Sequence, residues 1–136
     1  NKFIKKSFIL KNFAIGDNES LGKIDKSIDH ANVKIIKGKR SKIEENYIEI
    51  KIVKLSSLLK KCKVKNISCI KIDTEGYEYK ILKDFFKKVN LKYFPKFLII
   101  EHNNDENYYK NERIILKNKY EIQFTTNSNT IYKRNV

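Results

Sequence analysis

The alternation of apolar and polar positions in the first third of the chain predicts strands separated by irregular segments. Residues 8–15 place apolar side chains between lysine and asparagine, and the Gly-Asp-Asn turn at 16–18 ends that strand. Residues 21–41 are polar and contain two glycines, which predicts loops or short strands around 33–36. Residues 47–53, YIEIKIV, alternate strictly and predict an exposed or edge strand.

The hydrophobic period changes from 2 to 3.6 in the middle of the chain. Residues 67–72 form an apolar run with one lysine, which we interpret as a strand buried on both faces of a parallel sheet. Apolar residues from Tyr77 to Val89 then share one helical face, and this amphipathic helix ends near Asn90. Residues 97–100 repeat the apolar run, so residues 67–102 predict a right-handed strand-helix-strand crossover.

Three further elements complete the expected fold. Residues 55–61 are compatible with a short helix capped by a serine hydroxyl. Residues 106–117 predict a polar helix, and residues 120–125 and 130–134 predict a hairpin around the Asn-Ser-Asn turn. The order of elements therefore favours an α/β fold in one domain.

The charge of the chain raises nucleic acid as a partner, but the choice of cation argues against it. The formal net charge is +14, yet only Arg40, Arg113 and Arg134 are arginines. Arginine is the cation that bidentate phosphate and guanine contacts favour, whereas lysine-rich surfaces are commonly just solvated. The lysines and the abundant asparagine are typical of an AT-rich coding bias. We therefore expect no nucleic-acid partner and no specific function for the net positive charge.

Cysteine usage argues against a metal-binding protein, and the length of the apolar runs argues against a membrane-spanning protein. Cys62 and Cys69 are seven positions apart and form no Cys-x-x-Cys pair, so we expect no metal site and a buried, reduced Cys69. A cytoplasmic location follows from this. No run approaches the ~18 apolar residues of a membrane span. The chain contains no methionine, and Asn1 is not expected to be a natural beginning.

Candidate chemistry lies where the two buried runs stop, because ligands bind beyond the carboxyl ends of parallel strands. Asp73 and Glu75 place two carboxylates in a tight turn at Gly76, where they would orient a cationic donor, bind an acceptor or remove a proton. His102 follows the second run and is a candidate general base. For Glu78 we favour a structural role in the first turn of the helix, where its charge complements the dipole.

Two other functions stay open on the residues alone. Asp29 with Glu49 and Lys51 on a predicted strand suggests a metal-dependent nuclease, although Glu-x-Lys is also an ordinary solvent-facing pattern. A non-catalytic fragment that binds a partner or nucleic acid through its lysines is the other alternative.

One segment resembles a known signature. Residues 70–82, IKIDTEGYEYKIL, are similar to the signature of FkbM-type methyltransferases, in which Lys-Ile-Asp, a variable residue, Glu-Gly and a further Glu lead into a helix. Residues 14–17, AIGD, resemble the family's strand end before an insertion, and residues 55–59 resemble its lead into the signature strand without the usual aspartate. Residues 97–102 resemble its strand ending in Glu. Lys119-Tyr120 resembles its late Gly-Tyr, with lysine in place of glycine.

This resemblance implies a Rossmann-like class I methyltransferase sheet, mostly parallel with a C-terminal antiparallel hairpin. It implies S-adenosylmethionine as cofactor and a small-molecule or glycan acceptor, methylated at oxygen. Asp73 and Glu75 would then lie beside the donor methyl and the acceptor, with Gly16 and Asp17 near the adenine end. The family's glycine-rich loop and ribose-binding acid have no counterpart here. We therefore expect residues 1–136 to be a partial domain whose N-terminal half is missing. We expect this partial domain to be inactive until that half is supplied.

Overall fold

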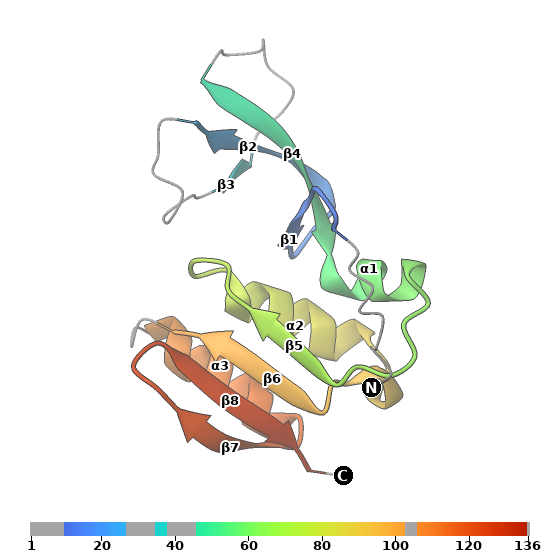
Figure 1. Cartoon of the computed structure of the whole chain (residues 1–136), viewed down its shortest axis with the longest axis vertical. Coiled ribbons are helices and arrows are strands. Elements are labelled where there is room, and N and C mark those ends of the chain that lie inside the picture. Colours follow the sequence, from blue (N-terminus) through green and yellow to red (C-terminus); the bar gives the residue numbers. More distant parts are fainter. Residues whose placement is uncertain (1–9, 27–34, 38–45, 103–105, 136) are drawn as a thin grey trace, which may run out of the picture.

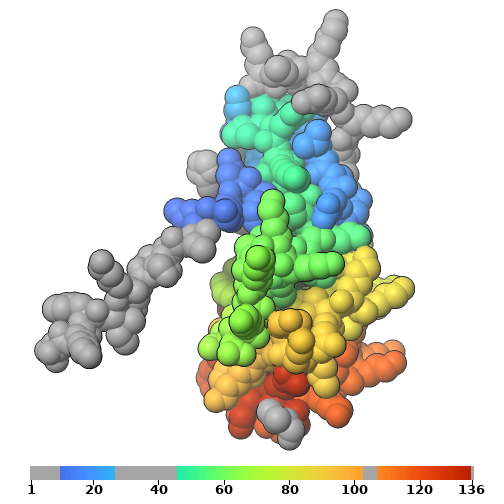
Figure 2. Space-filling view, turned by 90° about the vertical axis from the view of Figure 1, so that its right-hand side faces the viewer, coloured from blue at the N-terminus to red at the C-terminus, as the bar shows by residue number. Residues whose placement is uncertain are grey.

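The described residues form two four-stranded sheets that follow one another along the long axis of the molecule (Figure 1). The computed structural model describes residues 10–26, 35–37, 46–102 and 106–135. The first sheet contains β1 (Ala14–Gly16), β2 (Ser20–Asp25), β3 (Ile35–Lys37) and β4 (Tyr47–Lys54). The second contains β5 (Cys69–Ile72), β6 (Phe97–Glu101), β7 (Tyr120–Thr125) and β8 (Asn129–Arg134). Figure 2 shows the same order in space, with blue and teal residues toward one end and orange and red residues toward the other.

The first sheet has the order β1-β4-β2-β3 and is mixed. β1 runs parallel to β4, whereas β2 pairs antiparallel with both β4 and β3. β4 is a strand as predicted, but its expected edge position is wrong because it has a neighbour on each side. Its period-2 pattern reflects a solvated face, on which Glu49 and Lys51 are exposed. β2 occupies a segment predicted as irregular, since Gly22 and its polar neighbours obscure the alternation of that strand.

The second sheet has the order β5-β6-β8-β7 and is also mixed. β5 and β6 are parallel, with Ile72 opposite Ile100, as the strand-helix-strand prediction requires. β8 pairs antiparallel with β6 and with β7, so the C-terminal hairpin is confirmed. The expectation of a mostly parallel sheet is supported only in part, because each sheet is mixed and contains a single parallel pair among its described strands. The fold is a mixed α/β arrangement.

Two helices cover one face of the second sheet (Figure 1). They are α2 (Glu78–Lys88) and α3 (Glu106–Lys117), and both match the predicted segments. The centre of the apolar face of α2 is fully buried, with Ile81, Leu82 and Phe85 at 1% exposure or less. These side chains pack against Leu98 and Ile100 of β6 in the principal core. Burial on this scale contributes about 1.5–3 kcal/mol for each such side chain.

β5 differs from its prediction as a strand buried on both faces. Only Ile72 is fully buried in β5, whereas Cys69 and Lys71 are exposed. The reason is that α2 and α3 cover one face alone, and β5 pairs only with β6 among the described strands. The expectation of a buried Cys69 is therefore also wrong. A short apolar run does not distinguish a central strand from an edge strand whose polar positions are few.

A short helix connects the two sheets. It is α1 (Leu55–Lys61), and its range agrees with the prediction. The expected serine cap is wrong: Lys54 occupies the N-cap position, with no side-chain hydrogen bond. The hydroxyl of Ser56 instead donates to Asp84 of α2 at 2.6 Å, because the serine faces that helix. A 3-10 turn, η2 (Leu91–Tyr93), precedes β6. Among the described helices, none has the length and apolarity to cross a membrane.

Candidate functional site

The turn between β5 and α2 has an unusual backbone. Glu75 has φ of 51° and Gly76 has φ of 92°, so two successive residues adopt left-handed conformations. Glycine accepts this conformation without strain, whereas a residue with a Cβ loses about 1–2 kcal/mol. The Glu-Gly pair therefore lets the chain reverse tightly after Asp73 and enter the helix at once.

Glu78 holds that turn in place. Its side chain is 3% exposed, and its Oε1 atom accepts hydrogen bonds from the backbone nitrogen of Thr74 at 2.8 Å and its hydroxyl at 2.9 Å. The backbone nitrogen of Gly76 donates to the same oxygen at 3.3 Å. Glu78 is the first residue of α2, so the predicted place of its charge in the first helical turn is confirmed. Glu75 precedes the helix.

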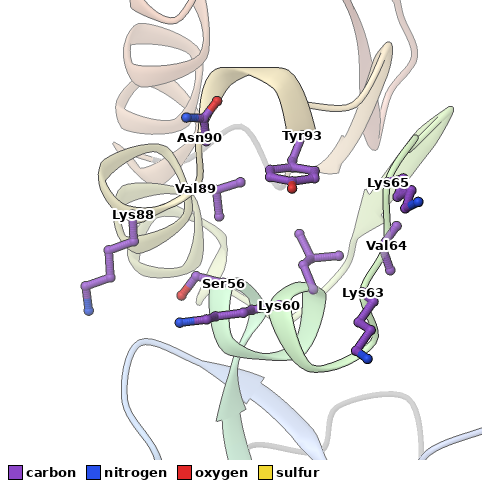
Figure 3. A pocket seen from close by; sticks show the side chains of 10 residues that line it. Ser56, Lys60, Lys63, Val64, Lys65, Lys88, Val89, Asn90 and Tyr93 are labelled. Carbon is purple, nitrogen blue, oxygen red and sulfur yellow. The ribbon is translucent and has the colours of Figure 1, made fainter.

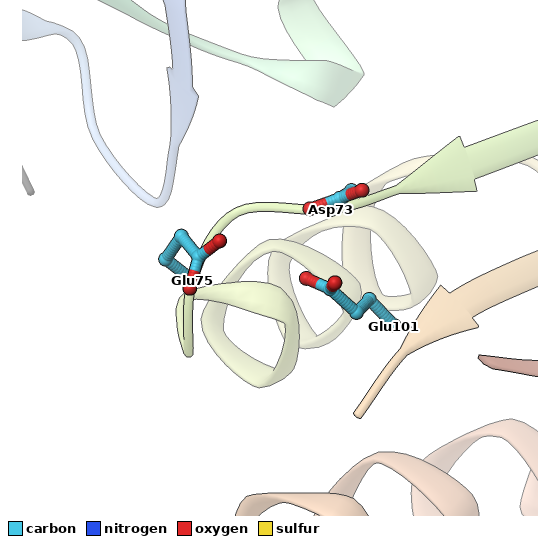
Figure 4. Close-up of side chains that lie close together, drawn as sticks. All are labelled: Asp73, Glu75 and Glu101. Carbon is cyan, nitrogen blue, oxygen red and sulfur yellow. The ribbon is translucent and has the colours of Figure 1, made fainter. Parts of the chain in front are cut away.

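Three carboxylates meet at the edge where β5 and β6 end (Figure 4). Asp73 follows β5, Glu75 lies in the turn, and Glu101 is the last residue of β6. One oxygen of each lies within 4.8 Å of the others. Because β5 and β6 are parallel neighbours, their carboxyl ends emerge together and bring residues 28 positions apart into one cluster. Asp73 and Glu75 are exposed, and Glu101 is half-buried.

The three acids do not share their negative charge equally. The ammonium group of Lys71 donates to Asp73 Oδ2 at 2.7 Å, and this contact lowers the pKa of Asp73. A hydrogen bond to Asp73, burial and the nearby charges together raise the pKa of Glu101 to about 7. Close carboxylates resist simultaneous ionisation. The cluster therefore pairs a firmly ionised acid with one that titrates near neutrality.

This arrangement has two chemical uses. It attracts a cation, since each additional positive charge relieves repulsion among the carboxylates. It also contains a group that can accept or release a proton at neutral pH, as general acid-base catalysis requires. Sequence reasoning placed Glu101 in the polar set after the second strand but did not choose it as a catalytic candidate. The signal was available, because Glu101 ends a strand that is parallel to the one before Asp73.

His102, the expected base, lies next to the cluster but is enclosed. Its side chain is 6% exposed, and its ring lies 4.5 Å from the ring of Tyr108. Its backbone nitrogen donates to the carbonyl oxygen of Ser128 at 2.9 Å, which ties it to the β7–β8 turn. The ring therefore belongs to the layer beneath Glu101 rather than to the open surface.

Gly16 and Asp17 lie in the first sheet, outside the carboxylate cluster. Gly16 ends β1, and a Cβ atom at this position would lie 2.6 Å from Cγ2 of Ile52. Close packing against β4 therefore explains this glycine without a ligand. Asp17 is half-buried in the following turn and already has an interaction partner. The place of the two residues near the adenine end of a donor stays a prediction.

A cavity lies near the N-terminal ends of β5 and β6, away from the carboxylate cluster (Figure 3). It has a volume of about 450 Å³, with Leu59, Val64, Val89 and Tyr93 as its apolar lining and lysines at its margin. Its residues precede β5 and β6, whereas the carboxylates follow them. The cavity is thus separate from the chemistry that the sequence predicts.

The rival metal-nuclease set is not assembled in the described part of the chain. Glu49 is exposed on β4 and does not belong to the carboxylate cluster. Asp29 lies outside the described residues.

Comparison with known families gives one match. The family model described as the methyltransferase FkbM domain matches residues 5–122. No curated protein and no solved structure matches the chain. The matched range contains the turn at Asp73 to Gly76 and the end of β6.

Proposed function

The chain belongs to the FkbM methyltransferase family, and on this premise we propose that it methylates a hydroxyl oxygen of a sugar, glycan or natural product. The observation that carries the proposal is the meeting of Asp73, Glu75 and Glu101 at the carboxyl ends of two parallel strands. Ligands of open α/β sheets bind at this edge.

The charge of the cluster fits S-adenosylmethionine as the methyl donor. When bound, this cofactor supplies a methyl group on a positively charged sulfur. The Asp73 and Glu75 carboxylates favour a bound cation. An approaching cation also stabilises the ionised form of Glu101, so that Glu101 releases its proton. Asp73 is already ionised through Lys71.

The acids would divide the work at the acceptor. Asp73 and Glu75 bind and align the acceptor hydroxyl beside the methyl group, and alignment supplies most of the acceleration. Glu101 accepts the hydroxyl proton as the new carbon-oxygen bond forms, and the sulfur keeps the electron pair of its broken bond. Glu101 suits this task better than His102 because its carboxylate is in the cluster and is ionised, and so free to accept a proton, once the cationic donor lies beside it.

The remaining cofactor contacts would come from another segment. The hollow next to Glu101 has a volume of only about 20 Å³, far below the ~300 Å³ of an ordinary ligand site. Among the described strands, β1 pairs only with β4 and β5 pairs only with β6. Each therefore offers a free edge to which further strands can add. We propose that a segment bearing the glycine-rich loop adds there and completes the donor site.

Calorimetric titration tests this function. The chain is produced with the coding sequence upstream of Asn1 and titrated with S-adenosylmethionine. Asp73→Asn should weaken donor binding about 5- to 30-fold, because removal of one charge near a cation is worth roughly 1–2 kcal/mol in a partly screened site.

Glu49→Gln is the matched control, since it also removes one carboxylate charge but on exposed β4. It should leave the affinity unchanged. Absence of donor binding in the folded, extended protein would refute the proposal. Equal losses in both variants would show that only the net charge matters.

A further inference from the structure

A small hollow lies beneath the carboxylate cluster. It has a volume of about 20 Å³ and is bordered by Glu78 at the start of α2, Glu101 and His102 at the end of β6, and Asn111 of α3. Tyr108 closes one side with its ring against His102, and its hydroxyl donates to Glu112 at 2.9 Å. The hollow thus joins the turn, the strand end and the second helix.

Two of its side chains are almost completely buried and carry polar atoms without a hydrogen-bond partner in the described structure. His102 is 6% exposed and Asn111 is 2% exposed. Neither ring nitrogen of His102 nor Oδ1 of Asn111 has a hydrogen-bond partner among the described residues. An unsatisfied buried polar atom costs about 1–3 kcal/mol, and native proteins rarely leave several together.

We propose that one ordered water molecule binds in this hollow and bridges His102 and Asn111. A volume of about 20 Å³ accommodates one water, which requires roughly 10–15 Å³ and two to four polar partners. The chemistry is complementary. A neutral imidazole has one nitrogen that donates and one that accepts, and the amide oxygen of Asn111 accepts the second hydrogen of the water.

The water gives His102 a task that rests on the proposed function. Because Glu101 borders the same hollow, the water lies between the imidazole and the carboxylate that accepts the acceptor's proton. His102 then acts through the water as a positioning residue for Glu101. The His102 ring is buried and does not contact the acceptor directly, which is compatible with this role.

The thermal stability of two variants separates a hydrated hollow from a dry one. Asn111→Leu and His102→Phe replace each polar group by an apolar group of similar size in the 136-residue chain. If water satisfies the polar groups, each variant loses its bridge and Tm falls by about 3–8 °C. If the hollow is dry, each variant removes an unsatisfied group and Tm stays level or rises, which would overturn the proposal.

A second measurement is independent of how well the leucine or phenylalanine packs. In the unaltered chain, a water-edited NMR experiment should show a cross-peak between bound water and the His102 ring protons, and Asn111→Leu should abolish it. A ring without any water contact would overturn the proposal even if Tm falls. In the extended protein, Asn111→Leu should shift the acid limb of the activity-pH profile while donor affinity stays unchanged. Absence of donor binding in the unaltered extended protein would instead count against the proposed function.

Discussion

Single residues with a left-handed backbone show how this chain departs from the family pattern. Lys119, which takes the place of glycine in the late Gly-Tyr pair, has φ of 65°. Its nitrogen and carbonyl oxygen bond to Leu116 and Asn135, so the conformation is fixed between α3 and β7. A glycine at this position is favoured by the turn itself, and no ligand is needed to explain it.

Lys119→Gly should therefore stabilise the chain. The substitution removes the steric cost of the left-handed conformation, partly offset by the greater flexibility of glycine in the unfolded state. We expect the free energy of unfolding to rise by about 0.5–1 kcal/mol in a urea titration. Lys83→Gly on the exposed face of α2 is the matched control and should lower it by about 1 kcal/mol. Destabilisation by both variants would contradict this account of Lys119.

At the scale of elements, the sequence predicted those structures whose pattern is local. The spacing of Ile81, Leu82 and Phe85 gave α2, and the Asn-Ser-Asn turn gave the β7–β8 hairpin. The sheet neighbours were less accessible, because pairing depends on distant strands. Nothing within residues 67–72 indicates that β5 has one neighbour among the described strands, and nothing within residues 47–53 indicates that β4 has two. Similarly, Ser56 makes its bond to a residue 28 positions away, so a local capping rule fails.

The candidate site was predicted in the same uneven way. Asp73 and Glu75 followed from one strand-turn-helix segment, which a sequence displays directly. Glu101 entered the cluster only through the parallel register of β5 and β6. The enclosure of His102 depends on Tyr108 of α3, which the order of residues does not reveal.

The β5–α2 turn provides a prediction at this scale. Glu78→Ala should lower the free energy of unfolding by about 1–2 kcal/mol, because it leaves the donors of half-buried Thr74 and exposed Gly76 without their shared acceptor. Glu78→Gln keeps an acceptor oxygen and should cost about 1 kcal/mol or less. Chemical denaturation of both variants measures the difference. Equal costs would show that Glu78 acts through its charge alone.

At the scale of the whole molecule, the net charge is positive, whereas the candidate site is acidic. The chain carries a formal net charge of +14, yet three carboxylates gather at the carboxyl edge of β5 and β6. An anion is attracted by the molecule as a whole, whereas a cation is favoured locally at this edge. The local field decides which ligand binds in contact with the site, because solvent and salt screen the distant lysines.

The titration of Glu101 links this local field to both stability and binding. Its pKa in the folded chain, about 7, exceeds the ordinary value of 4.5. The folded state therefore holds the proton more tightly, and this contribution to stability is present below pH 4.5 and is lost as pH rises from 4.5 through 7. A cation binds best to the ionised carboxylate, so donor affinity should increase over the upper part of the same range.

The most direct test of the central claim is the pKa of Glu101 with and without the donor. It is measured by carbon-13 NMR of the labelled side-chain carboxyl in the N-terminally extended protein. We predict a pKa near 7 in the free protein and a clearly lower value with S-adenosylmethionine at saturation. An unchanged pKa on saturation would show that the cationic donor does not lie at the edge formed by Asp73, Glu75 and Glu101, and would contradict the account.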